Sequence, residues 1–211
     1  MKLVILAGGY GTRLAEETKV KPKPLVKIGN KPIVWHLLKI YSYYGINDFI
    51  ICLGYKGDLL IKELNQISKK EDWKIKYVKT GLKTMTGGRI KKIQKFIKDD
   101  ENFCLSYGDG LSDVNIKKLI KFHLKNKKIA TLTAVKYKNP KGILIFGNQI
   151  KIKKIKEKPL EYINGGFFVL SKKIFKFLKN SKTIFEKDCL PKLAHANELI
   201  AFKHKGFWGC M

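Results

Sequence analysis

The chain has 211 residues, of which 45% are hydrophobic and 29% charged, a composition typical of a globular protein rather than a disordered or fibrous one. The length predicts a single domain. No stretch approaches the ~18 consecutive apolar residues of a membrane span, and the N-terminal apolar run is too short for a signal sequence. We therefore expect a cytoplasmic protein.

The charge is strongly positive, because 44 Lys and Arg residues oppose 17 Asp and Glu residues and give a formal net charge of +27. A field of this size attracts polyanions at low salt. The lysines are nevertheless spread along the chain and form no run typical of a basic tail. We interpret most of them as solvated surface residues and do not expect nucleic-acid binding.

Only two of the basic residues are arginines, Arg13 and Arg89, and both lie in glycine-rich segments. Arginine offers a rigid fork of several donors that lysine cannot imitate, so these positions are candidates for binding an anion. The four cysteines show no metal-binding or redox spacing. We expect ordinary packing or surface roles for the histidines His36, His123, His195 and His204.

The first two thirds of the chain alternate between strand patterns and helix patterns. Strands are expected at 2–7, 49–53, 74–78, 103–106 and 130–135, and helices at 31–44, 56–66, 89–98 and 114–125. Strands that alternate with helices at this spacing predict a doubly wound α/β sheet of mainly parallel strands.

The pattern changes after residue 142. Segments 143–146 and 150–155, joined through Gly147-Asn148, predict a β-hairpin. A further strand is expected at 167–170, and helices are expected at 172–179 and 184–196. The predicted fold class is therefore α/β, with a Rossmann-like, mixed and mainly parallel sheet and an added β-hairpin in the second half.

A glycine-rich loop follows the first expected strand directly, in the segment LAGGYGTRL at residues 6–14. Its glycines let the backbone approach a ligand closely and point N–H groups inward. Arg13 adds a charged fork, and Lys23 within the Lys-Pro-Lys-Pro segment 21–24 adds a point charge on stiff backbone. Since the loop after the first strand of an open α/β sheet is where nucleotides bind, this segment predicts a phosphate site.

Six segments, in chain order, resemble the sugar-1-phosphate nucleotidylyltransferases, and most closely the glucose-1-phosphate cytidylyltransferases. They are LAGGYGTRL, KPKP, MTGGRIKK, YGDG, EKP and INGGFFVL, and the similarity extends over essentially the whole chain. Residues 86–89 and 163–166 are more specific to the cytidylyl branch than the N-terminal loop. The resemblance implies one domain over 1–211, with a nucleotide-binding half at 1–136 and an acceptor-binding half at 137–211.

The resemblance also implies a role for each matching residue. Residues of the first half would bind CTP: Leu6, Ala7, Gly8, Gly9, Tyr10, Gly11, Thr12, Arg13, Lys23, Thr84, Arg89 and Gly108. Arg13 and Lys23 would hold the phosphates as catalytic residues, and Asp109 would ligate Mg²⁺. Lys158 would meet the acceptor phosphate, Glu157 its hydroxyl groups, and Asn164 lies in the same acceptor region.

Each assignment has an ordinary structural alternative. Asp109 could cap a turn of its own backbone, and Arg89 could be a surface residue of a helix. Lys158 could be one more solvated lysine, and the acceptor role of Glu157 is comparably uncertain.

The reaction implied by the resemblance needs no protein nucleophile. A phosphate oxygen of the acceptor attacks the α-phosphorus of CTP in line, and pyrophosphate leaves. The attacking group is already an anion at neutral pH, so no general base is required. What is required is charge neutralisation and positioning, from Mg²⁺ on a carboxylate, cationic side chains and loop amides.

Two internal segments depart from the family pattern. Residues 66–73 are a short connection where the family has an insertion that contributes to subunit contacts, so a homo-oligomer is possible but a hexamer is not expected. The regions 139–146 and 158–164 differ where the sugar would bind. The acceptor is therefore either glucose 1-phosphate or a phosphorylated amino acid such as phosphoglutamine, both on routes to surface polysaccharide or capsule.

By the same resemblance, a second Mg²⁺-binding aspartate and the C-terminal helices of the family would follow Met211. We expect weakened activity from a chain that ends there. A non-catalytic CTP-binding or scaffold protein is the alternative to an active enzyme.

Overall fold

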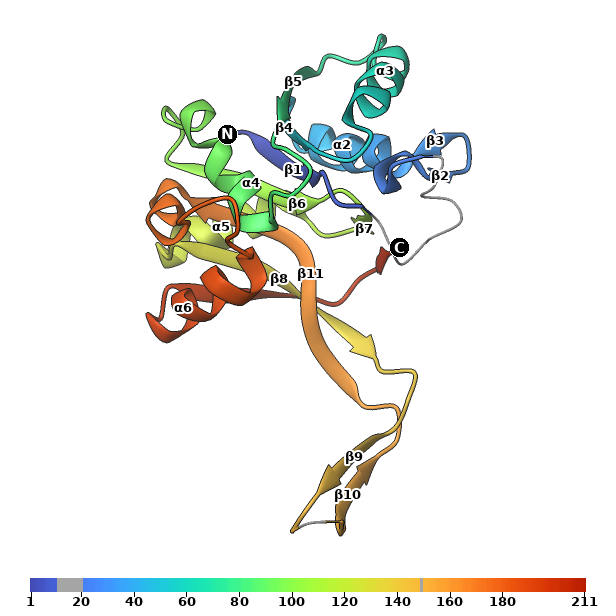
Figure 1. Cartoon of the computed structure of the whole chain (residues 1–211), viewed down its shortest axis with the longest axis vertical. Coiled ribbons are helices and arrows are strands. Elements are labelled where there is room, and N and C mark those ends of the chain that lie inside the picture. Colours follow the sequence, from blue (N-terminus) through green and yellow to red (C-terminus); the bar gives the residue numbers. More distant parts are fainter. Residues whose placement is uncertain (11–20, 149) are drawn as a thin grey trace.

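A seven-stranded sheet forms the centre of the protein (Figure 1). The computed structural model describes residues 1–10, 21–148 and 150–211. In spatial order the strands are β12 (Leu199–His204), β8 (Ala130–Lys138), β11 (Leu160–Ser171), β6 (Asn102–Tyr107), β1 (Leu3–Ala7), β4 (Asp48–Leu53) and β5 (Lys74–Lys79). Within this sheet β11 runs antiparallel to both of its neighbours, and all the remaining pairings are parallel. The predicted mixed, mainly parallel sheet is confirmed.

Helices cover both faces of the sheet. They are α2 (Ile33–Tyr43), α3 (Gly57–Ile67), α4 (Thr86–Lys92), α5 (Ile116–Asn126) and α6 (Leu190–His195). Alternate residues of a strand point to opposite faces, so Leu3 and Ile5 of β1 pack with α2, α3 and α5, whereas Val4 packs with α4 and α6. Burial on both faces explains why β1 is apolar at every position.

Helix α4 differs from the helix expected at 89–98. It begins earlier, at Thr86, and ends at Lys92, and the short 3-10 turn η3 (Gln94–Phe96) follows it. Its first turn lies against the segment 181–185, because a Cβ at Gly88 would be 2.7 Å from Ser181 Cα and a Cβ at Gly87 would be 2.8 Å from Thr183 Cγ2. The Gly-Gly pair is therefore a site of close packing inside a helix, although glycines usually indicate a loop.

The helices expected near the C-terminus are also different. Residues 172–179 form only the 3-10 helix η4 (Lys172–Phe177), and the segment 184–196 is divided into the π-helix η5 (Phe185–Cys189) and α6. Pro191 lies in the first turn of α6. Since proline has no N–H to donate, it starts a new helix here rather than continuing η5.

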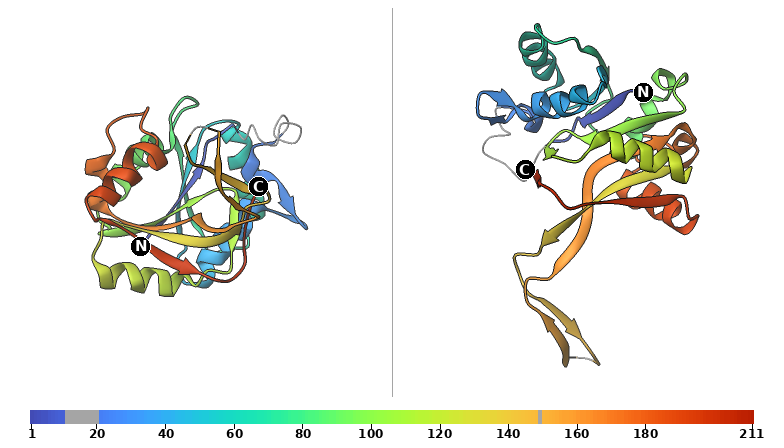
Figure 2. Two further views of the ribbon diagram at one scale, coloured as in Figure 1. Left: turned by 90° about the horizontal axis from the view of Figure 1, so that it is seen from below. Right: turned by 180° about the vertical axis from the view of Figure 1, so that it is seen from behind.

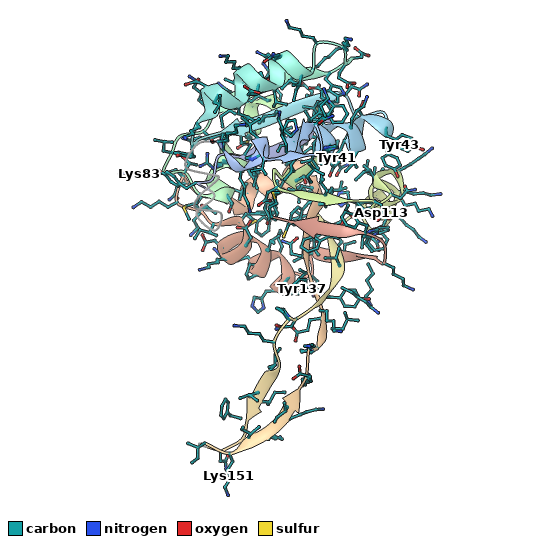
Figure 3. The ribbon with its side chains drawn as sticks, turned by 90° about the vertical axis from the view of Figure 1, so that its right-hand side faces the viewer. Tyr41, Tyr43, Lys83, Asp113, Tyr137 and Lys151 are labelled. Atoms are coloured by element: carbon teal, nitrogen blue, oxygen red, sulfur yellow. The ribbon has the colours of Figure 1, made fainter. Side chains whose placement is uncertain are left out.

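Strands β8 and β11 continue beyond the sheet as a two-stranded arm (Figure 1). Their pairing runs from Asn164 opposite Ala134 to Leu160 opposite Lys138, so both are longer than the strands expected from the sequence. At the tip, β9 (Ile143–Phe146) and β10 (Ile152–Lys156) form the predicted hairpin. We call residues 136–163 the β-arm; Tyr137 lies near its base and Lys151 at its tip (Figure 3).

The sequence analysis did not anticipate two further pairs of short strands, one of which holds the C-terminus beside the segment that follows β6 (Figure 2). Strand β13 (Trp208–Cys210) pairs antiparallel with β7 (Gly110–Ser112), and β2 (Lys27–Ile28) pairs with β3 (Lys31–Pro32). The last residue, Met211, donates its N–H to the Asp109 carbonyl. In the part of the chain that the structure describes, no helix is long and apolar enough to cross a membrane.

His123 of α5 is buried between this helix and the sheet, with 2% of its surface exposed. Its Nε2 lies 3.0 Å from Asn102 Oδ1, which can only accept, so Nε2 carries the proton. Its Nδ1 lies 2.8 Å from the Thr131 hydroxyl and accepts from it. Burial of this neutral ring lowers the pKa of His123 from 6.5 to about 4.

Acid should therefore destabilise the fold through His123. The unfolded chain binds a proton there near pH 6.5 and the folded chain only near pH 4. The free energy of unfolding should fall over this interval as the pH drops, by up to about 3 kcal/mol. Urea unfolding across this range measures the slope, which His123→Gln should reduce and the exposed His195→Gln should not; equal slopes in both variants would contradict the assignment.

Candidate active site

The loops at the carboxyl ends of four parallel strands lie together, and those after β1, β5 and β6 contain residues predicted to bind the nucleotide. The loop of Gly8 and Gly9 follows β1, Gly54 follows β4, Thr80 follows β5, and Gly108 follows β6. Loops at the carboxyl ends of parallel strands lie along one edge of the sheet, where open α/β sheets bind their ligands. We call this edge, with the four loops, the nucleotide edge.

The Gly8-Gly9 turn is shaped by close backbone contacts. A Cβ at Gly54 would lie 2.9 Å from Gly8 Cα, and a Cβ at Gly8 would overlap the Arg89 guanidinium. Gly9 is exposed, and Tyr10 packs its ring 5.4 Å from that of Tyr55. The turn presents backbone to the edge at Gly9, as a phosphate-binding loop requires.

Other predicted nucleotide residues lie in or beside this turn. Leu6 and Ala7 are the last residues of β1, and Leu6 O accepts from the N–H of Gly108 at 3.2 Å. The predicted residues Gly11, Thr12 and Arg13 lie outside the described residues.

Arg89 of α4 is buried, with 4% exposed, and its guanidinium joins three segments of the nucleotide edge. It donates to Gly8 O at 2.8 Å, to Leu53 O at 3.1 Å and to the Thr80 hydroxyl at 2.5 Å. Burial lowers the pKa of Arg89. No carboxylate of the described residues forms an ion pair with it, and its partners among them are backbone carbonyls and one hydroxyl. Arg89 is therefore no surface residue.

Thr84 lies in the turn between β5 and α4 and is buried. Its hydroxyl donates to Thr80 O at 2.6 Å and accepts from Lys92 Nζ at 3.3 Å. The side chain thus fixes the turn that leads into the helix of Arg89.

Lys23 and Asp109 meet at the nucleotide edge although they are far apart in sequence. Lys23 belongs to the 3-10 helix η2 (Lys23–Leu25), and its Nζ lies 2.6 Å from Asp109 Oδ2. A Cβ at Gly108 would lie 3.1 Å from Pro24 Cγ, so the glycine lets η2 approach β6. Lys23 Nζ also donates to Met211 O. The structure therefore brings together two residues that the sequence analysis assigned to phosphate and metal binding.

Asp109 has the chemistry of a Mg²⁺ ligand. Its carboxylate is 30% exposed and follows the end of β6. Among residues 1–10, 21–148 and 150–211, no group of three or more potential ligands could hold a metal ion. Mg²⁺ is commonly held by one or two carboxylates together with substrate phosphates and waters, so a single carboxylate beside the predicted phosphate-binding Lys23 fits this ion.

Of the predicted acceptor residues, Asn164 lies near the nucleotide edge and Glu157 and Lys158 do not. Asn164 Nδ2 donates to the Tyr107 hydroxyl at 3.4 Å, and Asn164 Oδ1 accepts from Gly166 N at 2.9 Å. Glu157 and Lys158 are exposed on the β-arm, beyond the last β8–β11 pair. The strand from Asn164 to Leu160 alone spans about 13 Å, so one chain does not bring these two residues to its own Asp109.

The sequence analysis did not identify Thr80, Tyr107 and Glu186. Thr80 and Glu186 lie outside every motif, and no spacing pattern distinguishes them. Tyr107 immediately precedes the Gly-Asp-Gly turn, and this position is the one signal that could have indicated it. Glu186 accepts hydrogen bonds from Tyr107 and Thr86.

Comparisons with known proteins identify the family of the chain. The nucleotidyl transferase family matches the chain over residues 2–209. A glucose-1-phosphate cytidylyltransferase of Salmonella typhimurium is 46% identical over 233 residues, which cover 99% of this chain and 90% of that protein. A probable glucose-1-phosphate cytidylyltransferase of Bacillus subtilis is 42% identical with the same coverage.

Among solved structures, HddC from Yersinia pseudotuberculosis has a TM-score of 0.78 at 30% identity, and the match covers 99% of this chain and 92% of that one. The family match, the identities and the shared fold lead to one conclusion: the chain belongs to the nucleotidyl transferase family and is a nucleotidyltransferase.

Proposed function

We propose that the chain is a cytidylyltransferase, which transfers CMP from CTP to the phosphate of a small acceptor and releases pyrophosphate. The similarity to two glucose-1-phosphate cytidylyltransferases over nearly the whole chain supports CTP as the donor. The observation that carries the proposal is the buried guanidinium of Arg89 at the nucleotide edge, which no described carboxylate neutralises. A triphosphate at this edge would supply the missing negative charge.

The residues of the chain would act by binding and positioning. Backbone amides of the Gly8-Gly9 turn would face the phosphates, together with Arg13 from the same loop. Lys23 would leave the Asp109 carboxylate and bind a phosphate oxygen, since its long side chain can move between these partners. Mg²⁺ held by Asp109 would neutralise phosphate charge during the transfer. No side chain has to move a proton, because the attacking acceptor phosphate is already an anion.

Glucose 1-phosphate is the acceptor that the relatives favour, because two of them are named for it. None of the relatives described above is named for a phosphorylated amino acid, so phosphoglutamine is the second acceptor to test. Either acceptor would place the reaction on a route to surface polysaccharide. A non-catalytic CTP-binding protein is the remaining alternative, and it differs from the enzyme in releasing no pyrophosphate.

The β-arm supports a homo-oligomer. At its tip Phe146 is paired with Ile152 and Leu144 with Ile155, and these four side chains are 48–61% exposed on one face of the hairpin. Exposed apolar patches of this kind mark interaction sites. We infer that the arm docks on a second copy of the chain and carries Glu157 and Lys158 to the acceptor site of that copy.

Asp109→Asn should abolish most turnover and leave the fold intact, because the amide removes the charge that would hold Mg²⁺. Pyrophosphate release, measured with CTP, UTP, dTTP and ATP against glucose 1-phosphate and phosphoglutamine, should occur with CTP and one acceptor. We expect the variant to lose about 100-fold or more in kcat, whereas the exposed Asp58→Asn should match the wild type. Binding of CTP without any pyrophosphate release by the wild type would favour the non-catalytic alternative.

Arg89→Lys should weaken CTP binding by about tenfold or more, because one ammonium cannot replace a fork that joins three segments. Titration calorimetry measures the dissociation constant, and thermal unfolding shows whether the variant is folded. Lys83→Arg is the matched control, since this exposed residue points away from the protein (Figure 3). An unchanged CTP affinity in folded Arg89→Lys would remove this residue from the site.

Mixing two inactive variants should restore activity if Lys158 acts on a second copy. Asp109→Asn and Lys158→Met should each be inactive alone. After subunit exchange in a twofold dimer, about a quarter of the sites would combine an intact Asp109 with an intact Lys158. Recovery of pyrophosphate release toward that level supports action between copies, and a mixture as inactive as its components contradicts it.

A further inference from the structure

Glu186 of the π-helix η5 accepts two short hydrogen bonds, one from the start of α4 and one from the end of β6. The Tyr107 hydroxyl donates to Oε1 at 2.6 Å, and the Thr86 hydroxyl donates to Oε2 at 2.7 Å. Tyr107 immediately precedes Gly108 and Asp109, and Thr86 begins the helix that carries Arg89. The carboxylate thus lies behind the nucleotide edge, and the proposed reaction gives it no role.

The Tyr107 side chain is held firmly in place. Its ring packs edge-on against Phe168, with the ring centres 5.7 Å apart, and a Cβ at Gly166 would lie 2.6 Å from Tyr107 Cδ2. Burial and the neighbouring Glu186 carboxylate raise the pKa of Tyr107, so the phenol keeps its proton. The hydroxyl therefore always has one proton to donate.

The direction of that proton and the backbone N–H of Gly166 together determine how Asn164 is oriented. A phenol has one proton, and Tyr107 gives it to Glu186, so toward Asn164 its oxygen can only accept. Asn164 must turn Nδ2 toward Tyr107, and its Oδ1 then accepts from Gly166 N. This leaves the carboxamide one N–H and one oxygen lone pair for a ligand, the pair that recognises a group able both to donate and to accept, such as a hydroxyl.

We propose that Glu186 is a positioning residue for the acceptor: through the Tyr107 hydroxyl it fixes the orientation of the Asn164 carboxamide. Without the carboxylate, the phenol proton is free to turn toward Asn164 and to favour the flipped amide, in which the donor and acceptor groups offered to the ligand are exchanged. The π-helical turn that carries Glu186 agrees with this role, because such turns are frequent at functional sites. This inference rests on the proposed cytidylyl transfer to a small acceptor.

Glu186→Met removes both hydrogen bonds and keeps the length of the side chain. We expect KM for the acceptor to rise about tenfold, which corresponds to the loss of one hydrogen bond between protein and ligand. The CTP dissociation constant should change less than about twofold. Tyr107→Phe should raise KM for the acceptor similarly. The double variant should resemble Tyr107→Phe alone, because both changes act through one hydroxyl. Glu101→Gln, which changes an exposed carboxylate at the opposite end of β6 from Tyr107, is the control and should match the wild type.

The outcomes separate the two proposals. If the wild type releases no pyrophosphate with any acceptor, the proposed function and this inference both fail. If the wild type is active and folded Glu186→Met keeps its KM for the acceptor, Glu186 has no positioning role and the function stands. A structural role alone would lower thermal stability with the KM unchanged, and additive effects in the double variant would also contradict action through Tyr107. If Glu186→Met does not fold, an unchanged KM in Tyr107→Phe still overturns the inference.

Discussion

The buried guanidinium of Arg89 joins the loops after three parallel strands, and the geometry of the nucleotide edge depends on it. Its acceptors belong to separate segments, at Gly8, Leu53 and Thr80. Burying a cation is unfavourable unless dipoles or an anion balance it. The side chain that joins these loops therefore also places a buried positive charge at this edge, and the missing Cβ of Gly8 leaves the space that it fills.

The position of Arg89 depends on how closely α4 approaches the C-terminal part of the chain. Gly87 and Gly88 remove the side chains that would separate the helix from segment 181–185, and the N–H of Gly88 donates to Thr183 O. Glu186 then binds Thr86 on one side and Tyr107 on the other. Besides the β11–β6 pairing, the two halves thus meet here through backbone contacts and one carboxylate, which also reaches Asn164 through the Tyr107 hydroxyl.

A single chain brings together the described residues predicted to bind the nucleotide phosphates and the metal, but not all of those predicted to bind the acceptor. On the nucleotide side, Lys23 and Asp109 already lie in contact, and the Gly8-Gly9 turn is in place. On the acceptor side, the β8–β11 pairing continues as an uninterrupted ladder from Ala134 to Lys138 and carries Glu157 and Lys158 outward. A connection of only five residues between Lys158 and Asn164 leaves too little chain to fold back over the edge while that ladder is formed.

The sequence by itself determined the family, the order of the main strands and helices, and the Gly-rich segment after the first strand, because these follow from local periodicity and from motifs that carry their own chemistry. The contact between Lys23 and Asp109 came from the tertiary structure. Only the tertiary structure decided that α4 starts at Thr86, that Arg89 is buried, that Glu186 links Tyr107 to Thr86, and that Glu157 and Lys158 lie on an arm. These features depend on contacts between residues tens of positions apart. The sequence alone does not distinguish a glycine that permits close packing, such as Gly88, from a glycine that ends a helix, such as Gly45. The difference depends on which atoms lie next to the glycine in the folded chain.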